Sequence, residues 1–283
     1  MDSGAHGVKS GTYRLANSKI RALTALLLLS SICLTAACGR QSAAFIIAGS
    51  TSVQPYVEIL EEEYAHMFSD ELIDVQGGGS SAGIQAVESD TAQLGMSSRN
   101  LKDNEQHLWS IEIAKDGLAI IVNPSNPTAN LTLAQLRGVY AADLTNWSEL
   151  GGPDARIHII AREEGSGTRS AFEEMVMGDR RITPRAIIQD SNGAVRQLVS
   201  DDPYSIGFIS LGLIEIGEKP VKPLRIDGIA ASQENVANGS YALYRPFLFV
   251  AKEEPTGTVM QFINFVRSPE GQRILASEGL IPE

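Results

Sequence analysis

Three short apolar runs in this chain are each followed by a turn rich in glycine and hydroxyl residues, and then by a segment with helical periodicity. The apolar runs cover residues 45–48, 72–75 and 157–160, and the turns cover residues 49–52, 77–83 and 162–168. Buried parallel strands are typically continuous apolar runs, and helices between such strands give an α/β fold. We therefore predict an α/β chain that binds its ligand at the carboxyl ends of its strands.

The three turns share a chemistry that suits an anion. A helix N-terminus presents unpaired N–H groups and about half a positive charge, which makes it a potential anion site. In any single turn the hydroxyl residues can be ordinary N-caps. Arg162, four residues before Ser166, favours the binding interpretation because a guanidinium beside backbone N–H groups fits a dianion. Glu164 is either an ion-pair partner of Arg162 or a solvated carboxylate. Three converging turns would hold a small tetrahedral oxyanion.

The first 37 residues have the layout of a secretory signal. Four basic residues precede the apolar run 22–34, which ends in small residues before Cys38. This run is shorter than the ~20 residues that cross a bilayer as a helix. We predict a signal peptide over residues 1–37 and a short tether over residues 38–43, so the mature chain is extracytoplasmic.

Residues 34–39, LTAACG, resemble a bacterial lipobox, in which the cysteine is lipidated and becomes the new N-terminus. Thr35 departs from the commonest lipobox pattern, and ordinary signal cleavage is the alternative. Because Cys33 falls within the signal, Cys38 would be the only cysteine left, and no internal disulfide is then possible. We expect the chain to be anchored to the cell membrane by lipidated Cys38.

Composition excludes several classes of function. Removing residues 1–37 leaves 19 basic and 33 acidic residues, a net charge of about −14. That charge argues against a nucleic-acid partner, which requires a basic surface. One mature cysteine and three scattered histidines make no metal-ligand cluster, so we predict neither a metal nor a cofactor. About 245 residues can bury a large core in one elongated domain or two lobes.

Two segments look like crossings between two lobes. Residues 117–122 form an apolar run that ends in a sharp break at 123–127, and residues 244–251 form another, with breaks on both sides. Two crossings would make one lobe discontinuous and place a hinge between the lobes. The predicted boundaries are 44–122 with 229–283 for lobe 1, and 123–228 for lobe 2.

Four segments, in this order, resemble the phosphate-binding proteins of phosphate-specific ABC transporters: AGST at 48–51, QGGGSSAG at 76–83, LGMSSR at 94–99 and GSGTR at 165–169. Each motif alone is weak, but four in order are specific, and the resemblance covers the mature chain from about residue 44. It implies a two-lobed periplasmic-binding-protein-like fold of type II, each lobe with a mixed sheet flanked by helices, joined by two crossover strands. It also implies a receptor, expected to be monomeric, that closes on one phosphate and delivers it to a membrane permease.

The resemblance implies a set of ligand residues by position: Thr51, Ser52, Ser80, Ser98, Arg162, Ser166, Gly167 and Thr168. Ser98 stands where many members have an aspartate, which accepts a hydrogen bond from protonated phosphate and so rejects sulfate. A serine hydroxyl accepts as well as donates, so it need not exclude sulfate as strictly. Arg99, next to it, is either a second cationic contact or part of a surface ion pair.

Three alternatives remain open at this stage. A receptor of the same fold could bind sulfate, molybdate or tungstate, and a non-transport role such as sensing or adhesion would also fit the fold. Residues 79–83 match the Gly-x-Ser-x-Gly nucleophile elbow, so a serine hydrolase that uses Ser81 is a formal alternative. A hydrolase would need His107 or His158 as its base, and His158 lies in an apolar strand where a packed or edge histidine is expected. We therefore predict a binding protein without enzyme activity.

Overall fold

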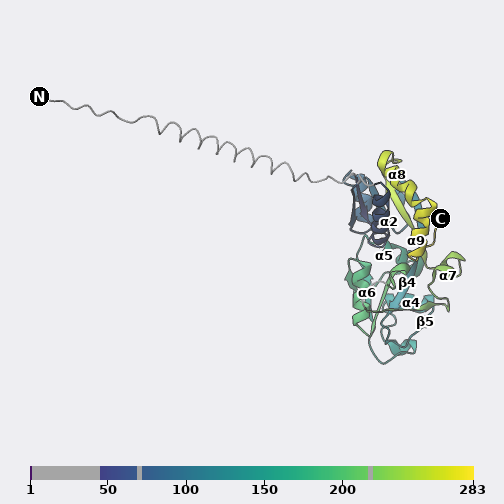
Figure 1. The fold of residues 1–283 in the computed structure, drawn as a ribbon. Helices are drawn as coiled ribbons and strands as arrows, with labels where there is room; N and C mark the ends of the chain where they lie inside the picture. Colours follow the sequence, from purple (N-terminus) through teal and green to yellow (C-terminus); the bar gives the residue numbers. More distant parts are fainter. Residues whose placement is uncertain (2–44, 69–71, 216–218) are drawn as a thin grey trace. The chain divides into compact units, whose positions relative to one another are not determined.

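The computed structural model describes Met1 and residues 45–68, 72–215 and 219–283 (Figure 1). The described residues from Phe45 onward belong to one compact unit. Apart from Met1, the predicted signal peptide, the tether over 38–43 and the lipidation residue Cys38 lie outside the described residues. No helix in the described part of the chain combines the length and apolar character needed to cross a membrane.

The elements alternate as the sequence pattern predicts. The strands are β1 (Phe45–Gly49), β2 (Ile73–Gly77), β3 (Leu94–Ser97), β4 (Trp109–Val122), β5 (Asn130–Leu131), β6 (His158–Arg162), β7 (Ile187–Gln189), β8 (Ser205–Ser210), β9 (Lys222–Pro223), β10 (Arg225–Ile226) and β11 (Tyr244–Ala251). The α-helices are α2 (Gln54–Met67), α3 (Ser80–Glu88), α4 (Leu133–Tyr140), α5 (Gly167–Phe172), α6 (Asn192–Asp201), α7 (Gln233–Ala237), α8 (Gly257–Val266) and α9 (Pro269–Ser277). Short 3-10 helices are η1 (Asp103–Glu105), η2 (Trp147–Leu150) and η4 (Leu211–Leu213).

The main sheet is mixed, with strand order β2-β1-β3-β11-β4-β8-β6-β7 and β9 paired to β4. Strand β1 is parallel to β2 and β3, and β6 is parallel to β7 and β8. Strand β11 runs antiparallel to both β3 and β4. Each parallel group therefore places the carboxyl ends of its strands, and the turns that follow them, at one edge.

Strand β4 joins the two groups of strands. Its first part, residues 109–117, pairs with β11, and its second part, residues 118–122, pairs with β8. The predicted crossing at 117–122 is thus the second half of a longer strand, and the predicted strand over 244–251 matches β11. Two groups of parallel strands joined through β4 and β11 agree with the two-lobed fold that the sequence predicts, while the lobe boundaries stay a prediction.

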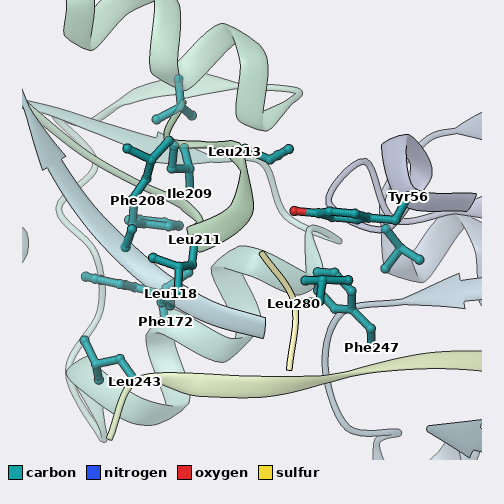
Figure 2. Close-up of a cluster of buried hydrophobic side chains, with 14 of the residues drawn as sticks. Tyr56, Leu118, Phe172, Phe208, Ile209, Leu211, Leu213, Leu243, Phe247 and Leu280 are labelled. Atoms are coloured by element: carbon teal, nitrogen blue, oxygen red, sulfur yellow. The ribbon is translucent and has the colours of Figure 1, made fainter. Parts of the chain in front are cut away.

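Aromatic and aliphatic side chains form the core on both sides of β4. Phe172 of α5 stacks on Phe208 of β8 with ring centroids 4.2 Å apart, and Leu118 lies beside them (Figure 2). Tyr56 of α2 packs against Phe247 of β11 at 5.9 Å. These buried contacts hold α5 against β8 and α2 against β11.

One helix departs from the expected pattern. The sequence predicts a helical face made of Phe172, Met175 and Val176, but α5 passes at Glu173–Met177 into a π-helical turn, η3. A π-turn accommodates more residues than an α-turn, which rotates the later residues around the axis. Met177 is therefore buried with Val176, whereas Met175 is only partly buried.

Candidate functional site

The turns after β1, β2, β3 and β6 meet and bring together eight of the nine predicted ligand residues. We call these eight the cradle: Thr51, Ser52, Ser80, Ser98, Arg162, Ser166, Gly167 and Thr168. Thr51 and Ser52 follow β1, Ser80 opens α3 after β2, and Ser98 follows β3. The remaining four come from the end of β6 and the start of α5, where Ser166 is the N-cap.

Direct hydrogen bonds connect the turn after β6 to the turns after β1 and β2. Ser52 Oγ and Thr168 Oγ1 lie 2.8 Å apart, and Arg162 Nη2 donates to Thr51 Oγ1 at 3.1 Å. The N–H of Ser81 donates to the carbonyl of Gly165 at 3.1 Å. Residues more than 80 positions apart in the sequence therefore build one site.

Gly167 allows the closest approach within the cradle. A Cβ atom on this residue would lie 2.2 Å from Ser80 Oγ and 2.5 Å from Ser98 Oγ. Both distances are below any real carbon–oxygen contact, so a side chain here would force the two turns apart. The first turn of α5 thus presents bare backbone to two hydroxyls, which suits N–H donation to a small anion.

Arg162 is the buried cation of the cradle, with 1% of its surface exposed. Its Nε and Nη2 donate to the two carboxylate oxygens of Glu163 at 2.8 and 2.9 Å. Of the two alternatives for Glu164, the structure shows the solvated carboxylate and not the ion pair: Glu164 is exposed, and Glu163 folds back along the guanidinium in its place. Arg162 Nη1 is buried and has no hydrogen-bond partner, so a donor remains free for a ligand.

A second buried arginine, Arg245, was not predicted. Its Nε and Nη2 donate to Asp116 Oδ2 at 3.1 and 2.9 Å, and Nη2 also donates to Ser52 Oγ at 3.2 Å. Burial raises the pKa of the Asp116 carboxyl above its ordinary value, and the charge of Arg245 opposes that shift. Arg245 Nη1, like Nη1 of Arg162, is buried without a partner. The available signal was Arg245 as the single charged residue of the predicted crossing over 244–251, together with Asp116 directly before the predicted crossing over 117–122.

Asn192 and Ser50 also belong to this network and were not predicted. Asn192, the first residue of α6, donates from Nδ2 to Ser52 Oγ at 2.8 Å. Ser50 Oγ donates to Ser98 Oγ at 2.8 Å. Ser50 lay inside a recognised turn, and Asn192 lies in another polar turn, residues 190–193, that follows the short apolar strand β7. The strand-and-turn pattern could therefore have identified both residues.

Ser98, the position that departs from the resemblance, is fully buried inside the cradle. Its hydroxyl accepts the hydrogen bond from Ser50, and its backbone N–H donates to Ser80 Oγ at 3.0 Å. The two hydroxyls of Ser80 and Ser98 lie 3.4 Å apart, which is long for a hydrogen bond between oxygens. The hydroxyl protons of Ser80 and Ser98 therefore make at most a weak hydrogen bond within the protein.

Arg99, the ninth predicted residue, stands apart from the cradle. Its Nη1 and Nη2 donate to the two oxygens of Glu105 at 2.7 and 2.9 Å, and only a 3.4 Å contact leads from Nη2 to Ser81 Oγ. The pair is buried, not a surface ion pair. Burial raises the pKa of the Glu105 carboxyl, but hydrogen bonds from Arg99 and from the N–H of Lys102 outweigh it, so the pKa lies below its usual range.

The hydrolase alternative needs a histidine near Ser81. Ser81 contacts the turn after the carboxyl end of β6, whereas His158 begins that strand, roughly 13 Å away by strand rise. The His158 ring is bonded through Nδ1 to Asp202 at 2.6 Å and is partly exposed. His107, the other candidate, lies 3.4 Å from Glu88 on the surface. Neither contact forms a Ser-His pair with Ser81.

Comparison with known proteins agrees with this geometry. A family model described as a PBP superfamily domain matches residues 35–270. The phosphate-binding protein PstS of Bacillus subtilis is 29% identical over 248 residues, covering 86% of this chain and 82% of that protein.

Two solved structures are similar in sequence and in fold. One is a putative phosphate ABC transporter substrate-binding protein from Clostridium perfringens with bound phosphate, at 42% identity and a TM-score of 0.81. The match spans 84% of the chain described here and 99% of the Clostridium perfringens chain. The other is an ABC-type phosphate transport receptor from Vibrio cholerae, at 35% identity and a TM-score of 0.71, covering 84% of this chain and all of that chain. These relatives are transport receptors and not enzymes. The chain described here therefore belongs to the PBP superfamily, among the phosphate-binding proteins of the PstS type.

Proposed function

We propose that this protein captures inorganic phosphate between its two lobes and delivers it to the membrane permease of an ABC transporter. One observation carries the proposal: hydroxyl and N–H donors from four strand ends converge with Arg162, whose Nη1 is buried without a partner. Fixed donors of this kind replace the hydration shell of an anion. The named relatives bind the same ligand, which supports the choice of phosphate.

The ligand residues in this proposal are those predicted from the sequence: Thr51, Ser52, Ser80, Ser98, Arg99, Arg162, Ser166, Gly167 and Thr168. Arg99 differs from the others because both of its terminal nitrogens are bonded to Glu105. Its part in binding is therefore expected to be smaller than that of Arg162.

The proposal includes the cellular setting. The lipobox-like segment before Cys38 and the basic and apolar residues ahead of it support an extracytoplasmic lipoprotein. The proposal also takes over the expected monomer, with lobe 1 over 44–122 and 229–283 and lobe 2 over 123–228. Mass spectrometry of the membrane fraction tests the anchor. A diacylglyceryl modification on an N-terminal Cys38 is the expected result, and an unmodified N-terminus contradicts it.

Calorimetric titration of residues 39–283 with phosphate, sulfate and molybdate tests the binding function. The protein is first unfolded and refolded to remove any bound anion. We expect phosphate to bind with micromolar or tighter affinity and more tightly than the other two anions. A preference for sulfate or molybdate would move the function to that anion, and absence of binding to all three would contradict a receptor for tetrahedral oxyanions.

A further inference from the structure

Exposed apolar side chains gather at one place on the surface of the described residues. Three large apolar residues, Met67, Phe68 and Leu72, lie within six positions of one another in the sequence. Their side chains are between 45% and 50% exposed. Single exposed apolar residues are ordinary, whereas a cluster of them marks an interaction surface. We call these three residues the apolar tip.

The apolar tip lies at the edge of the sheet where the chain enters β1. Helix α2 starts after the carboxyl end of β1 and ends at Met67, shortly before β2, so its last turn returns to the amino ends of these strands. Strands β1 and β2 are parallel, with Phe45 opposite Ile73. Leu72, directly before β2, is therefore at the same edge as the entry into β1.

A row of aromatic rings supports this placement. The ring centroid of Phe68 lies 4.7 Å from that of Tyr64. Tyr64 lies 5.3 Å from Phe262 of α8, the helix beside α2, and Phe262 lies 6.0 Å from Phe45 (Figure 1). Tyr64, Phe262 and Phe45 are buried. The row therefore links the first residue of β1 to Phe68, which the core holds while half of its surface stays outside.

The predicted lipid anchor is within reach of the apolar tip. Cys38 precedes Phe45 by seven positions. Seven extended residues span at most about 25 Å. A lipid on Cys38 would place that residue at the bilayer surface, so the edge where the chain enters β1 could lie no further than this from the membrane. A lipid surface is therefore the partner that the apolar tip meets first.

The carboxylates of α2 stand back from the apolar tip. Glu61, Glu62 and Glu63 precede Met67 by four to six positions in this helix. A helix rises 1.5 Å per residue, so these residues lie about 6–9 Å behind Met67 along the axis. Apolar residues of interfacial helices enter the headgroup boundary to a depth of roughly 5–10 Å. The apolar tip can therefore enter this boundary while the three carboxylates stay in water.

The charges near the apolar tip indicate which lipids it prefers. Residues 54–77 contain no lysine or arginine, and Asp70 and Glu71 lie between Phe68 and Leu72 in the sequence. Binding to anionic lipids requires basic residues near the surface, which this segment lacks. The contact is therefore expected to be apolar and to favour neutral lipids.

We propose that Met67, Phe68 and Leu72 insert into the headgroup boundary of the bilayer that holds the lipidated Cys38, and that they set the orientation of the receptor on the membrane. This inference rests on the lipid anchor in the proposed function. The lipid fixes only the N-terminus, whereas the apolar tip fixes one edge of the sheet. The cradle lies at the opposite ends of β1 and β2, roughly 17 Å away by strand rise. The cradle is therefore directed away from the bilayer in this orientation.

The test uses the whole lipidated protein in phosphatidylcholine vesicles, with a nitroxide spin label on one introduced cysteine. The lipid blocks the thiol of Cys38, so Met67→Cys or Leu72→Cys supplies the only free thiol of the mature chain. Collisions of the label with oxygen, which concentrates in lipid, are compared with collisions with a water-soluble nickel complex. We expect the oxygen-to-nickel ratio at both positions to be severalfold higher in vesicles than in detergent-free solution of the protein without its lipid.

The matched control is Ile187→Cys in β7. Ile187 is 47% exposed and Met67 is 48% exposed, and β7 lies at the other end of the strand order from β2. Ile187 and its exposed neighbour Ile188 point to opposite faces of their strand, so they do not form one patch. The label at position 187 should collide mainly with the nickel complex, in vesicles as in solution.

A second variant tests whether the apolar side chains themselves hold the contact. Met67→Ser combined with Phe68→Ser should return a label at Leu72→Cys to the ratio found in water. Phosphate affinity should not change, because the apolar tip and the cradle lie at opposite ends of the strands. If thermal unfolding shows that the double change disturbs the end of α2, Met67→Ser alone is measured and should give a partial shift in the same direction.

The outcomes separate this inference from the proposed function. A protein without lipid on Cys38 that stays in the soluble fraction would contradict the proposed anchor. Lipidated protein whose labels at positions 67, 72 and 187 all behave as in water would overturn the membrane contact and leave the anchor intact. Labels shielded from both reagents, with dipolar broadening between them, would mean that a second copy covers the apolar tip. A contact that forms only with phosphatidylglycerol would contradict its apolar basis.

Discussion

The two buried arginines of the cradle are held in different ways. Arg162 ends β6 and pairs with Glu163, its neighbour in the sequence, whose side chain is 28% exposed. Arg245 lies in β11 and pairs with Asp116 of β4, 129 positions away, and this carboxylate is completely buried. Each arginine keeps one buried Nη1 without a partner.

The difference shows two routes to the same result, a buried guanidinium with a donor to spare. In the Arg162 pair the carboxylate keeps part of its hydration, so losing Arg162 leaves a Glu163 carboxylate that water can still reach. In the Arg245 pair both charges depend on each other, because neither reaches water. We therefore expect Arg162 to govern ligand affinity and Arg245 to govern the stability of the fold as well.

The largest expected effect is on stability, from Arg245→Met. This change leaves the Asp116 carboxylate buried without a counterion, which costs about 3–5 kcal/mol. The measurement is the free energy of unfolding from urea titration, with Arg180→Met as control because the Arg180–Asp143 pair is exposed. Adding Asp116→Asn to Arg245→Met should recover part of the loss. Equal losses of unfolding free energy for Arg245→Met and Arg180→Met would contradict the special role of Arg245 in stability.

The next effect is on affinity, from Arg162→Ala. Loss of hydrogen bonds from a charged donor is expected to weaken phosphate binding by roughly 30- to 150-fold, about 2–3 kcal/mol. Calorimetric titration measures the change, and Arg180→Ala should leave affinity unchanged. If Arg162→Ala still binds phosphate tightly, the cradle is not the phosphate site.

A smaller loss of affinity is expected from Gly167→Ala. The new methyl group would meet the hydroxyls of Ser80 and Ser98, so the turn of α5 has to shift away from both. We expect about a tenfold loss, near 1.4 kcal/mol. Gly193→Ala in α6 is the matched control because its Cβ meets no atom within 4 Å. Similar affinities for the two variants would argue against close approach at Gly167.

Exchanging the carboxylate beside Arg162 tests the local pair. Glu163→Gln removes the charge that orients Arg162, and we expect a few-fold loss of phosphate affinity, below about 1 kcal/mol. Glu164→Gln, at the exposed position next to it, is the control and should bind as the unchanged protein does. An effect at Glu164 in place of Glu163 would contradict the observed pairing.

The smallest effect concerns another buried arginine, Arg99, and its partner Glu105. Because the pKa of Glu105 is lowered in the folded protein, the pair stabilises the fold above the unfolded-state pKa, and this contribution is lost as pH falls through the folded pKa. Glu105→Gln should therefore lower the melting temperature near neutral pH, with a gap that narrows in acid. Melting curves of both proteins at several pH values measure the gap, and a gap that widens in acid would contradict the assignment.

Much of the site could be predicted because it is built from local segments. The turn at Ser50–Ser52 and the turn at Ser166–Thr168 each follow an apolar strand directly, and helix-start chemistry is visible in consecutive residues. The mixed two-lobed fold followed from the same alternation and from the family resemblance. Glu163 and Glu164 were harder to distinguish, because the choice depends on the turn that directs one side chain outward.

The sequence by itself determined which residues carry anion chemistry, since a strand, a hydroxyl-rich turn and a helix start are local features. Only the tertiary structure decided how the donors are directed. Asp116, Asn192 and Arg245 come from three elements far apart in the chain, β4, α6 and β11. Asn192 and Arg245 both donate to Ser52, and Asp116 holds Arg245, only because these three elements pack together. Hydrogen-bond direction depends on every neighbour of a hydroxyl at once, and those neighbours are fixed by long-range packing.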